Sequence, residues 1–422
     1  MTQFENSLEF AHRMDADDGL KRFRDRFAMP LSADGNEVLY FTGNSLGLMP
    51  KTVRSYVEQE LADWEKLAVE GHMNAKNPWL RYHEFLTEQM AAVVGAMPIE
   101  TVVMNSLTVN LHLLMVSFFQ PTSEAPFVMI EKGAFPSDQY AVESQMKCHG
   151  LDPRQFLIEL APRDGEATLG TEDIVATIEE YDGQIAMILL GGVNYYTGQA
   201  FDMQAITAAG HKAGAIVGFD LAHAAGNLHL KMHDWDVDFA VWCCYKYLNG
   251  GPGAVGGAFV HERHARKFDL CRMAGWWGHD KETRFQMGPE FKPLPGAEGW
   301  QISNPPILQM AALRASLEIF AEAGMPALRA KSEKLTGYLE SLIDGIAADR
   351  IEVITPRDPG QRGCQLSIRV RGGDRSLHQK LSDRGVVSDW REPDVIRVAP
   401  TPLYNSFDDV YRFSEILKEC LA

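Results

Sequence analysis

The sequence predicts an α/β protein with a large domain built on a mainly parallel sheet and a smaller C-terminal α/β domain. From about residue 100 onward, short apolar runs alternate with helical segments. Strands separated by helices form mainly parallel sheets that helices wrap. From about residue 305 the pattern changes to two helices followed by short strands. At 422 residues the chain is long enough for two or three domains.

The N-terminal segment, residues 1–50, is expected to form an arm that packs with the small domain. It is polar, with helical stretches and a short β-like run at Val38–Phe41 that leads into a loop rich in Gly, Asn and Pro. Pro50 then opens a long amphipathic helix. The spacing of its apolar residues predicts one buried face, which comprises Val53, Val57, Leu61 and Trp64.

The large domain is expected over residues 51–304 and the small domain over residues 305–422. Short apolar runs are the strand candidates of the large domain; they are Phe127–Ile130, Ile185–Leu190, Ala215–Phe219, Phe239–Cys243 and Ala254–Val260. The small domain is predicted to open with a helix around Leu308–Ala323 and a second helix. Its strand candidates are Ile351–Ile354, Gln365–Val370 and Val395–Val398.

Composition narrows the classes of partner. The net charge of −17 and the pI of about 5.2 argue against nucleic acid or an anionic membrane as a partner. The N-terminus lacks a basic region before an apolar core, and no apolar run is long enough to span a bilayer. The six cysteines lack metal-ligand spacing, so we expect reduced thiols, no metal site and a cytoplasmic protein.

Lys246 is the most informative residue, because it lies between two apolar runs and precedes a glycine-rich segment. A lysine in apolar surroundings loses hydration, which favours the neutral, nucleophilic amine that forms Schiff bases. The predicted strand Ala215–Phe219 runs directly into Asp220, and an acid there lies at the ligand-binding edge of an open α/β sheet. Pyridoxal 5′-phosphate needs such a pair: the acid keeps the pyridine nitrogen protonated and the lysine holds the aldehyde carbon.

Two further segments suit the same ligand. Asn105–His112 reads as a turn that enters an apolar helix, where backbone N–H groups and the Thr108 hydroxyl could bind a phosphate or form an ordinary cap. Glu131–Asp138 follows an apolar strand and therefore lies at the same sheet edge. Its Phe135 could stack on a flat ring or pack within the loop.

Three candidates for substrate contacts carry open alternatives. Arg397 lies between apolar residues on a short strand, so it needs an anionic partner, either a substrate carboxylate or an internal acid. The pair Trp276 and Trp277 lies in a glycine-flanked loop and could line a ligand or pack internally. His72 is expected in a loop, where a histidine contacts a ligand less often than it caps or faces solvent.

Together these segments resemble the kynureninases, a family of fold type I pyridoxal phosphate enzymes. The similarity extends over nearly the whole chain. The acid–lysine pair is common to the whole superfamily, whereas three runs are far more specific: Asn-Ser-Leu-Gly-Leu at 44–48, Tyr-Lys-Tyr-Leu-Asn at 245–249 and Ser-Asn-Pro-Pro at 303–306. The resemblance implies the aspartate-aminotransferase-like fold, with a mostly parallel, seven-stranded sheet in the large domain.

The resemblance also implies the cofactor-binding residues. Lys246 would carry pyridoxal 5′-phosphate, Asp220 would pair with the pyridine nitrogen, and Phe135 would stack on the ring. The rest of the cofactor site would comprise residues near the ring or its phosphate: Leu107, Thr108, Ser137, Asp138, His223 and Tyr245. Trp276 and Asn304 would enter from the partner subunit, so that the active unit is a homodimer with shared active sites.

At the substrate end, the resemblance implies that Arg397 binds the substrate carboxylate. Ser45, His72, Asn304 and Trp277 would face the substrate; Trp277 stands where some members carry Phe. The implied reaction hydrolyses the Cβ–Cγ bond of L-kynurenine in tryptophan catabolism, with 3-hydroxy-L-kynurenine as a second candidate substrate. The products are L-alanine and anthranilate or its hydroxylated form. Lys246, Tyr245 and Asp220 would be the catalytic residues, and the bulk of the two tryptophans predicts a modest preference for L-kynurenine.

Two alternatives stay open from the sequence. Another fold type I lyase, such as a cysteine desulfurase-like enzyme, would need a mobile loop cysteine near the cofactor, and no cysteine here lies in an obvious Gly/Ser-rich loop. A pyridoxal phosphate-binding regulator without turnover would usually carry a basic DNA-binding module, and this chain is acidic with a short N-terminal segment.

Overall fold

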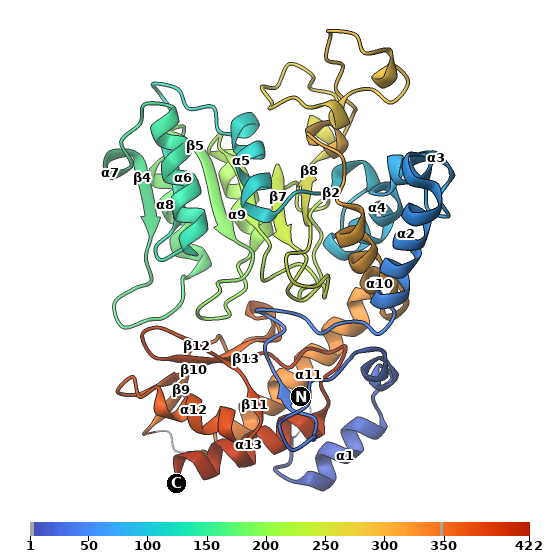
Figure 1. Cartoon of the computed structure of the whole chain (residues 1–422). Coiled ribbons are helices and arrows are strands. Elements are labelled where there is room, and N and C mark those ends of the chain that lie inside the picture. The colour runs from blue at the N-terminus through green and yellow to red at the C-terminus, as the bar shows by residue number, and fades with distance from the viewer. Residues whose placement is uncertain (1–3, 347–348) are drawn as a thin grey trace.

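The computed structural model describes residues 4–346 and 349–422, and its largest sheet has seven strands in the order β2-β8-β7-β6-β5-β3-β4 (Figure 1). Only β8 (Gly256–Val260) runs antiparallel to its neighbours in this sheet. The other strands are β2 (Thr101–Met104), β3 (Phe127–Glu131), β4 (Leu157–Leu160), β5 (Ile185–Gly191), β6 (Ile216–Asp220) and β7 (Phe239–Cys243). This confirms the predicted α/β fold with a mostly parallel seven-stranded sheet.

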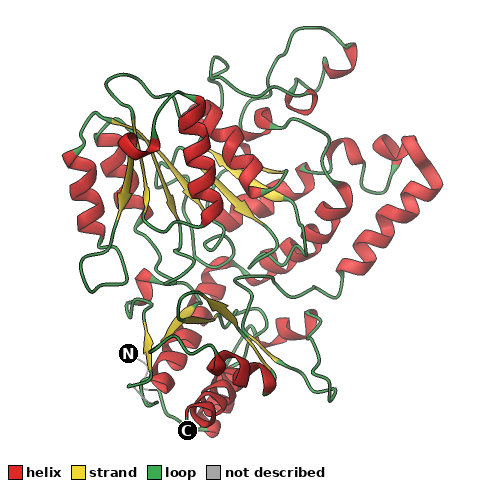
Figure 2. Ribbon diagram, turned by 60° about the vertical axis from the view of Figure 1, so that its left-hand side comes forward, coloured by secondary structure: helices red, strands yellow, loops and turns green. Residues whose placement is uncertain are grey.

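Helices cover both faces of this sheet, as Figure 2 shows. Alternate residues of its strands belong to two different apolar clusters, one for each face. One cluster includes residues of α5 (Leu107–Phe118) and α6 (Pro136–Cys148). The other includes residues of the helices α4 (Glu84–Val94), α8 (Thr171–Glu180), α9 (Met203–Lys212) and α10 (Ile307–Ala323). The short α7 (Pro153–Phe156) leads into β4.

A second, antiparallel sheet of four strands, in the order β12-β13-β10-β9, lies in the C-terminal part of the chain. Its strands are β9 (Ile351–Val353), β10 (Leu366–Val370), β12 (Asp389–Arg391) and β13 (Val395–Val398). Apolar residues of this sheet share a separate cluster with those of three helices, which are α11 (Met325–Ile343), α12 (Ser376–Asp383) and α13 (Phe407–Leu421).

The N-terminal segment packs on this C-terminal part. Its helix α1 (Leu8–Ala16) lies against α13, and Asp15 accepts hydrogen bonds from the backbone N–H groups that open α13. Its short strand β1 (Leu39–Tyr40) pairs in parallel with β11 (Val386–Val387). The N-terminal segment is therefore joined to the C-terminal part by the hydrogen bonds of Asp15 to the start of α13 and by the pairing of β1 with β11.

The predicted buried face of the first long helix is wrong for its C-terminal half. This helix, α2 (Val53–Leu67), begins three residues after Pro50, and its Leu61 and Trp64 are 42% and 61% exposed. The buried residue of α2 is Glu60, whose carboxylate accepts hydrogen bonds from the side chains of Asn77, Trp79 and Tyr82. Val57 packs against the apolar cluster that includes α10, whereas Leu61 and Trp64 further along the helix face away from it.

Candidate active site

One pocket at the carboxyl ends of the parallel strands contains most of the predicted site residues. Open α/β sheets bind ligands at this edge. Side chains from the start of α5, the β3–α6 connection and the segments after β6 and β7 line the pocket. The predicted residues among them are Leu107, Thr108, Phe135, Ser137, Asp138, Asp220, His223, Tyr245 and Lys246. Residues that are far apart in the sequence meet here because each follows a neighbouring strand or opens the next helix.

Lys246 lies in the loop after β7, and its Nζ is 3.1 Å from Nε2 of His223. The same Nζ lies 5.9 Å from the ring centroid of Phe135 and 5.8 Å from that of Tyr245. The predicted apolar surroundings are therefore wrong in part, since the pocket around the amine also contains carboxyl groups. The apolar runs on either side of Lys246 pack into the sheet instead.

Three buried carboxyl groups, those of Glu131, Asp138 and Asp220, line this pocket. Burial raises the pKa of Asp138, and a hydrogen bond to Asp220 raises it further, so Asp138 is the protonated partner. Burial also raises the pKa of Asp220 and raises that of Glu131 to about 7. A cation next to these acids would offset their cost of burial, and a protonated pyridine nitrogen is such a cation.

His223 and Tyr245 are both held in their neutral forms. Burial, and then the positive charge of Lys246, lower the pKa of His223 well below its ordinary value. Its Nδ1 is a buried atom without a hydrogen-bond partner among the described residues. Burial raises the pKa of Tyr245, so its hydroxyl keeps its proton and can donate it. The pocket therefore offers neutral donors and acceptors beside one lysine.

The start of α5 provides backbone N–H groups for an anion. Ser106 caps this helix without a side-chain hydrogen bond, and Asn105 before it has a φ of +47°. A Cβ added to Gly256 would lie 3.1 Å from the Leu107 nitrogen, so this glycine allows β8 to approach the helix start. With the carboxyl groups and Lys246 across the pocket, the residues present fit pyridoxal 5′-phosphate.

Of the two partners that the sequence allowed for Arg397, a substrate carboxylate or an internal acid, the structure contains an internal acid, Asp389. Its side chain is 1% exposed, and its Nε and Nη2 each lie 2.6 Å from a carboxylate oxygen of Asp389. Nη2 also donates to Oγ of Ser45 at 3.0 Å, and Nη1 donates to the carbonyl of Tyr195 at 2.8 Å. Because Tyr195 lines the cofactor pocket, this cluster lies beside it.

The remaining predicted residues do not line this pocket in the single chain. His72 belongs to the short helix α3 (Gly71–Asn74) rather than to a loop; its ring contacts Trp79, and its Nδ1 is hydrogen-bonded to Val69. Trp276 and Asn304 are exposed. Trp277 is buried against the guanidinium of Arg284, a geometry that favours packing over contact with a substrate.

Three residues near the pocket were missed as site residues: Glu131, Tyr195 and Asp389. Glu131 is the last residue of β3, and its position after an apolar run is the same signal that identified Asp220. Tyr195 follows β5 within the segment Asn194–Thr197, and its ring meets Phe135 edge to face at 5.2 Å. Asp389 gave no comparable signal, because its role depends on the pairing of β12 with β13.

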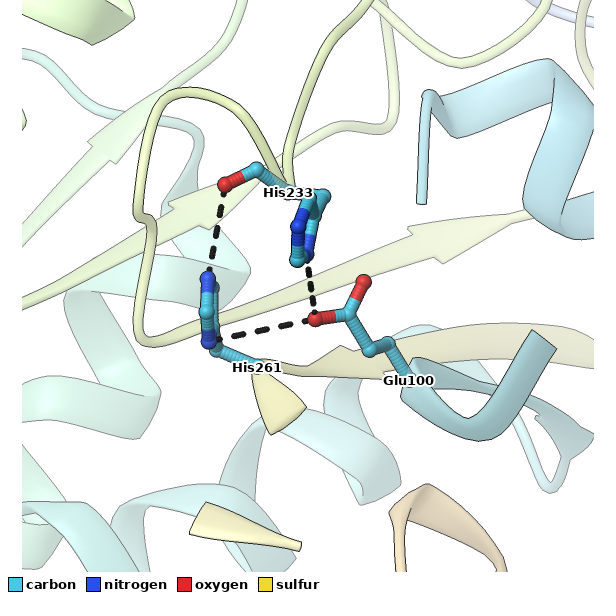
Figure 3. A group of neighbouring side chains, drawn as sticks. All are labelled: Glu100, His233 and His261. Atoms are coloured by element: carbon cyan, nitrogen blue, oxygen red, sulfur yellow. Dashed lines mark hydrogen bonds and ion pairs between the residues drawn. The ribbon is translucent and has the colours of Figure 1, made fainter. Parts of the chain in front are cut away.

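The opposite edge of the sheet contains a second polar cluster, Glu100, His233 and His261 (Figure 3). These side chains are close enough together to hold a metal ion. Yet Glu100 already accepts hydrogen bonds from Nδ1 of His233 at 2.9 Å and from two backbone N–H groups at 2.8 Å. The cluster is therefore satisfied within the protein and joins loops at this edge.

Comparison with known proteins places the chain in a family. Residues 328–417 match the model of the kynureninase C-terminal domain. A kynureninase of Koribacter versatilis is 63% identical over 410 residues, which are 97% of either chain. A kynureninase of Myxococcus xanthus is 60% identical over 415 residues, which are 98% of this chain and 97% of the relative. The chain belongs to the kynureninase family.

Solved structures show the same fold at low sequence identity. A cysteine desulfurase of Thermococcus onnurineus superposes with a TM-score of 0.76 at 16% identity and covers 100% of this chain and 99% of its own. The cysteine desulfurase CsdA of Escherichia coli gives 0.74 at 16% identity, with 96% and 98% covered. At such identity the likeness concerns the fold alone. The alternative of a desulfurase-like lyase is not favoured, and no described cysteine lines the pocket.

Proposed function

We propose that the protein hydrolyses the Cβ–Cγ bond of L-kynurenine to anthranilate and L-alanine with pyridoxal 5′-phosphate as its cofactor. The observation that carries this proposal is the meeting of Lys246, Asp220 and the start of α5 in one pocket of a chain that is 63% identical to a kynureninase. Kynureninases of other bacteria also align over nearly the full chain, at 52% identity or more for those compared. A regulator without turnover finds no support in these relatives.

The cofactor would be held at its two ends. Lys246 would bind its aldehyde carbon, and Asp220, supported by the protonated Asp138, would face its pyridine nitrogen. The N–H groups of Leu107 and Thr108 would bind its phosphate. When bound, pyridoxal 5′-phosphate supplies a carbonyl for the substrate amine and a ring that accepts electrons.

The side chains of the pocket would then move protons. The Lys246 amine, once free, would take the proton from Cα of the substrate. The Tyr245 hydroxyl is held in its protonated form by burial and would donate to the β-carbon after the bond is broken. Water adds to the ketone carbon and supplies the second carboxylate oxygen of anthranilate. The neutral Nε2 of His223, 3.1 Å from Lys246 Nζ, would orient the amine.

The substrate would be held at its carboxylate by Arg397 and Ser45, which lie in hydrogen-bond contact beside the pocket. Its aryl end would meet Asn304 and Trp276 of a partner subunit. The active unit would then be a homodimer, which is supported by the exposure of both residues and by that of Leu61 and Trp64 on α2. His72 would approach from the same side.

The location is proposed as cytoplasmic, because all six cysteines are unpaired. Among the described residues, no helix has the length and apolar character needed to cross a bilayer. The acidic composition is consistent with a small-molecule substrate rather than nucleic acid.

The proposal is tested by assay and by mapping. Purified protein saturated with pyridoxal 5′-phosphate should convert L-kynurenine to equal amounts of anthranilate and L-alanine. Borohydride reduction and peptide mapping should place the pyridoxyl group on Lys246. An adduct on Lys132 or Lys212, or no cleavage by the saturated protein, would contradict the assignment.

A further inference from the structure

The cluster beside the pocket contains two arginines and one acid. Arg391 and Asp389 lie on β12, and Arg397 lies opposite Asp389 on β13. Nη2 of Arg391 is 3.5 Å from Oδ2 of Asp389, the oxygen that Nη2 of Arg397 also contacts. The cluster therefore carries one net positive charge, which a single substrate carboxylate would balance.

Asp389 occupies the part of Arg397 that is best suited to a carboxylate. The Nε and Nη2 of a guanidinium form a fork that binds two carboxylate oxygens at once. Both atoms lie 2.6 Å from Asp389. Nη1 donates to a backbone carbonyl, and Nη2 also donates to Ser45. A buried arginine without a partner is costly, so this fork needs a carboxylate before the substrate arrives.

Asp389 has an alternative partner, Arg391, if another carboxylate displaces it from Arg397. Its side chain is 16% exposed, whereas that of Arg397 is 1% exposed, so the acid lies on the solvent side of the pair. Arg391 is 37% exposed and already within reach of it. The Ser45 hydroxyl also donates to Asp389. Exchange of one carboxylate for another on Arg397 would give the incoming carboxylate the donors of Arg397 and Ser45, while Asp389 keeps Arg391 as its partner.

We propose that Asp389 is an internal counter-ion that occupies the carboxylate fork of Arg397 and is displaced by the substrate carboxylate onto Arg391. The proposal rests on the assignment of Arg397 as the carboxylate-binding residue in the proposed function. Asp389 is thus a positioning residue that sets the affinity for ligands that carry a carboxylate. Competition of this kind reduces the apparent affinity by the fraction of time that the fork is free.

A pair of ligands that differ only in the carboxylate tests this proposal. L-alanine, a product of the proposed reaction, and L-alaninamide are titrated into the holoenzyme, and the absorbance of the bound cofactor reports the Kd. Asp389→Asn should lower the Kd of L-alanine about tenfold and leave that of L-alaninamide unchanged. Its KM for L-kynurenine should fall while kcat is preserved. Asp389→Glu, which keeps the charge, is the matched control and should not tighten L-alanine.

The outcomes separate this proposal from the proposed function. If Asp389 only orients Arg397, Asp389→Asn will weaken L-alanine, and that result or an unchanged Kd overturns the proposal. Asp389→Ser is a second neutral variant with the same expected tightening, should Asp389→Asn fail to fold. Arg397→Gln tests the underlying assignment: equal affinity for the two ligands in wild type and in this variant would remove Arg397 from the substrate site, whatever Asp389 does.

Discussion

Buried acids lie at both strand ends of the seven-stranded sheet, one group at the carboxyl-end edge and one at the opposite, amino-end edge. The charges of the two groups are compensated in different ways. At the carboxyl-end edge, Glu131, Asp138 and Asp220 share one lysine, and burial raises the pKa of each. At the opposite edge, Asp238 accepts hydrogen bonds from His211, His264, Arg263 and the backbone of Val217. Burial alone would raise the pKa of Asp238, but these donors lower it far below its ordinary value.

The difference separates an edge built for stability from an edge built for a ligand. An acid that the protein itself satisfies contributes to folding. An acid that burial leaves poorly compensated costs folding free energy, and a bound cation recovers that cost. Residue type therefore does not distinguish the two edges; the number of donors around each carboxylate does.

Asp220→Asn should produce the largest effect on activity. The neutral amide cannot keep a pyridine nitrogen protonated, so we expect kcat for L-kynurenine to fall about 10² to 10³-fold. The variant should still bind the cofactor, and its thermal midpoint should not fall. Steady-state assays on cofactor-saturated protein measure the loss. A near-normal kcat would show that the acids of this edge do not act on the ligand.

Asp238→Asn should have the opposite effect. The amide keeps one acceptor oxygen but loses the charge and turns an NH2 donor toward Arg263 and two histidines, which costs about 4 kcal/mol of folding free energy. The urea midpoint should fall, and kcat of the folded enzyme should stay within twofold of wild type. Asp164→Asn, at an exposed position, is the control. A fall in kcat without a loss of stability would break the division between the edges.

Glu131→Gln should change how the stability of the cofactor-free protein depends on pH. The pKa of Glu131 is raised to about 7 in the fold, so its neutral form is fully compatible with folding below about pH 4.5. That stability is lost as the pH rises through about 7, at a cost of about 3 kcal/mol. The variant should therefore gain stability over wild type at pH 8 and none at pH 4. Urea titrations at both values provide the test; equal gains would contradict it.

The smallest effect on activity is expected for changes at the aryl end of the substrate, which neutral side chains would contact. L-kynurenine should be preferred over its 3-hydroxy form by about tenfold or less, since a pocket that lacks a partner for a hydroxyl discriminates weakly. The ratio of kcat/KM for the two substrates measures this preference. A ratio that favours the hydroxylated substrate, and that Asn304→Ala abolishes, would reverse the prediction and identify the amide as its cause.

The central strands could be predicted from the sequence because they are buried on both faces. β7 and β13 have the predicted bounds, and β3 and β5 extend one residue further. β2 and β4 were missed, because each has only four residues, which is too short a run to stand out as a strand. β4 is moreover only partly buried, whereas β2 is fully buried. Of the C-terminal strand pair, β13 was predicted and β12 was missed. Two of the three residues of β12 are charged, so it shows no apolar run.

The pocket could be predicted where a side chain follows directly from a strand or opens a helix. Asp220 and Lys246 are of this kind. The partner of Arg397 could not be predicted from the sequence. Asp389 lies opposite Arg397 only because of the register between the antiparallel strands β12 and β13. The exposure of Leu61 and Trp64 on α2 could not be predicted either, since periodicity gives the apolar face of a helix but not which part of that face another element covers.

The reversed strand β8 has a mechanical consequence. The chain passes from Lys246 through the glycine-rich loop directly into β8, and the first residue of this strand, Gly256, donates its N–H to Asn105 beside the start of α5. The β7–β8 connection thus links the lysine to the start of α5. This connection fixes the distance between Lys246 and the start of α5. A cofactor bound at one of these two points would therefore already be aligned with the other. A cut or an insertion in this connection would uncouple the two points even if every pocket side chain were retained.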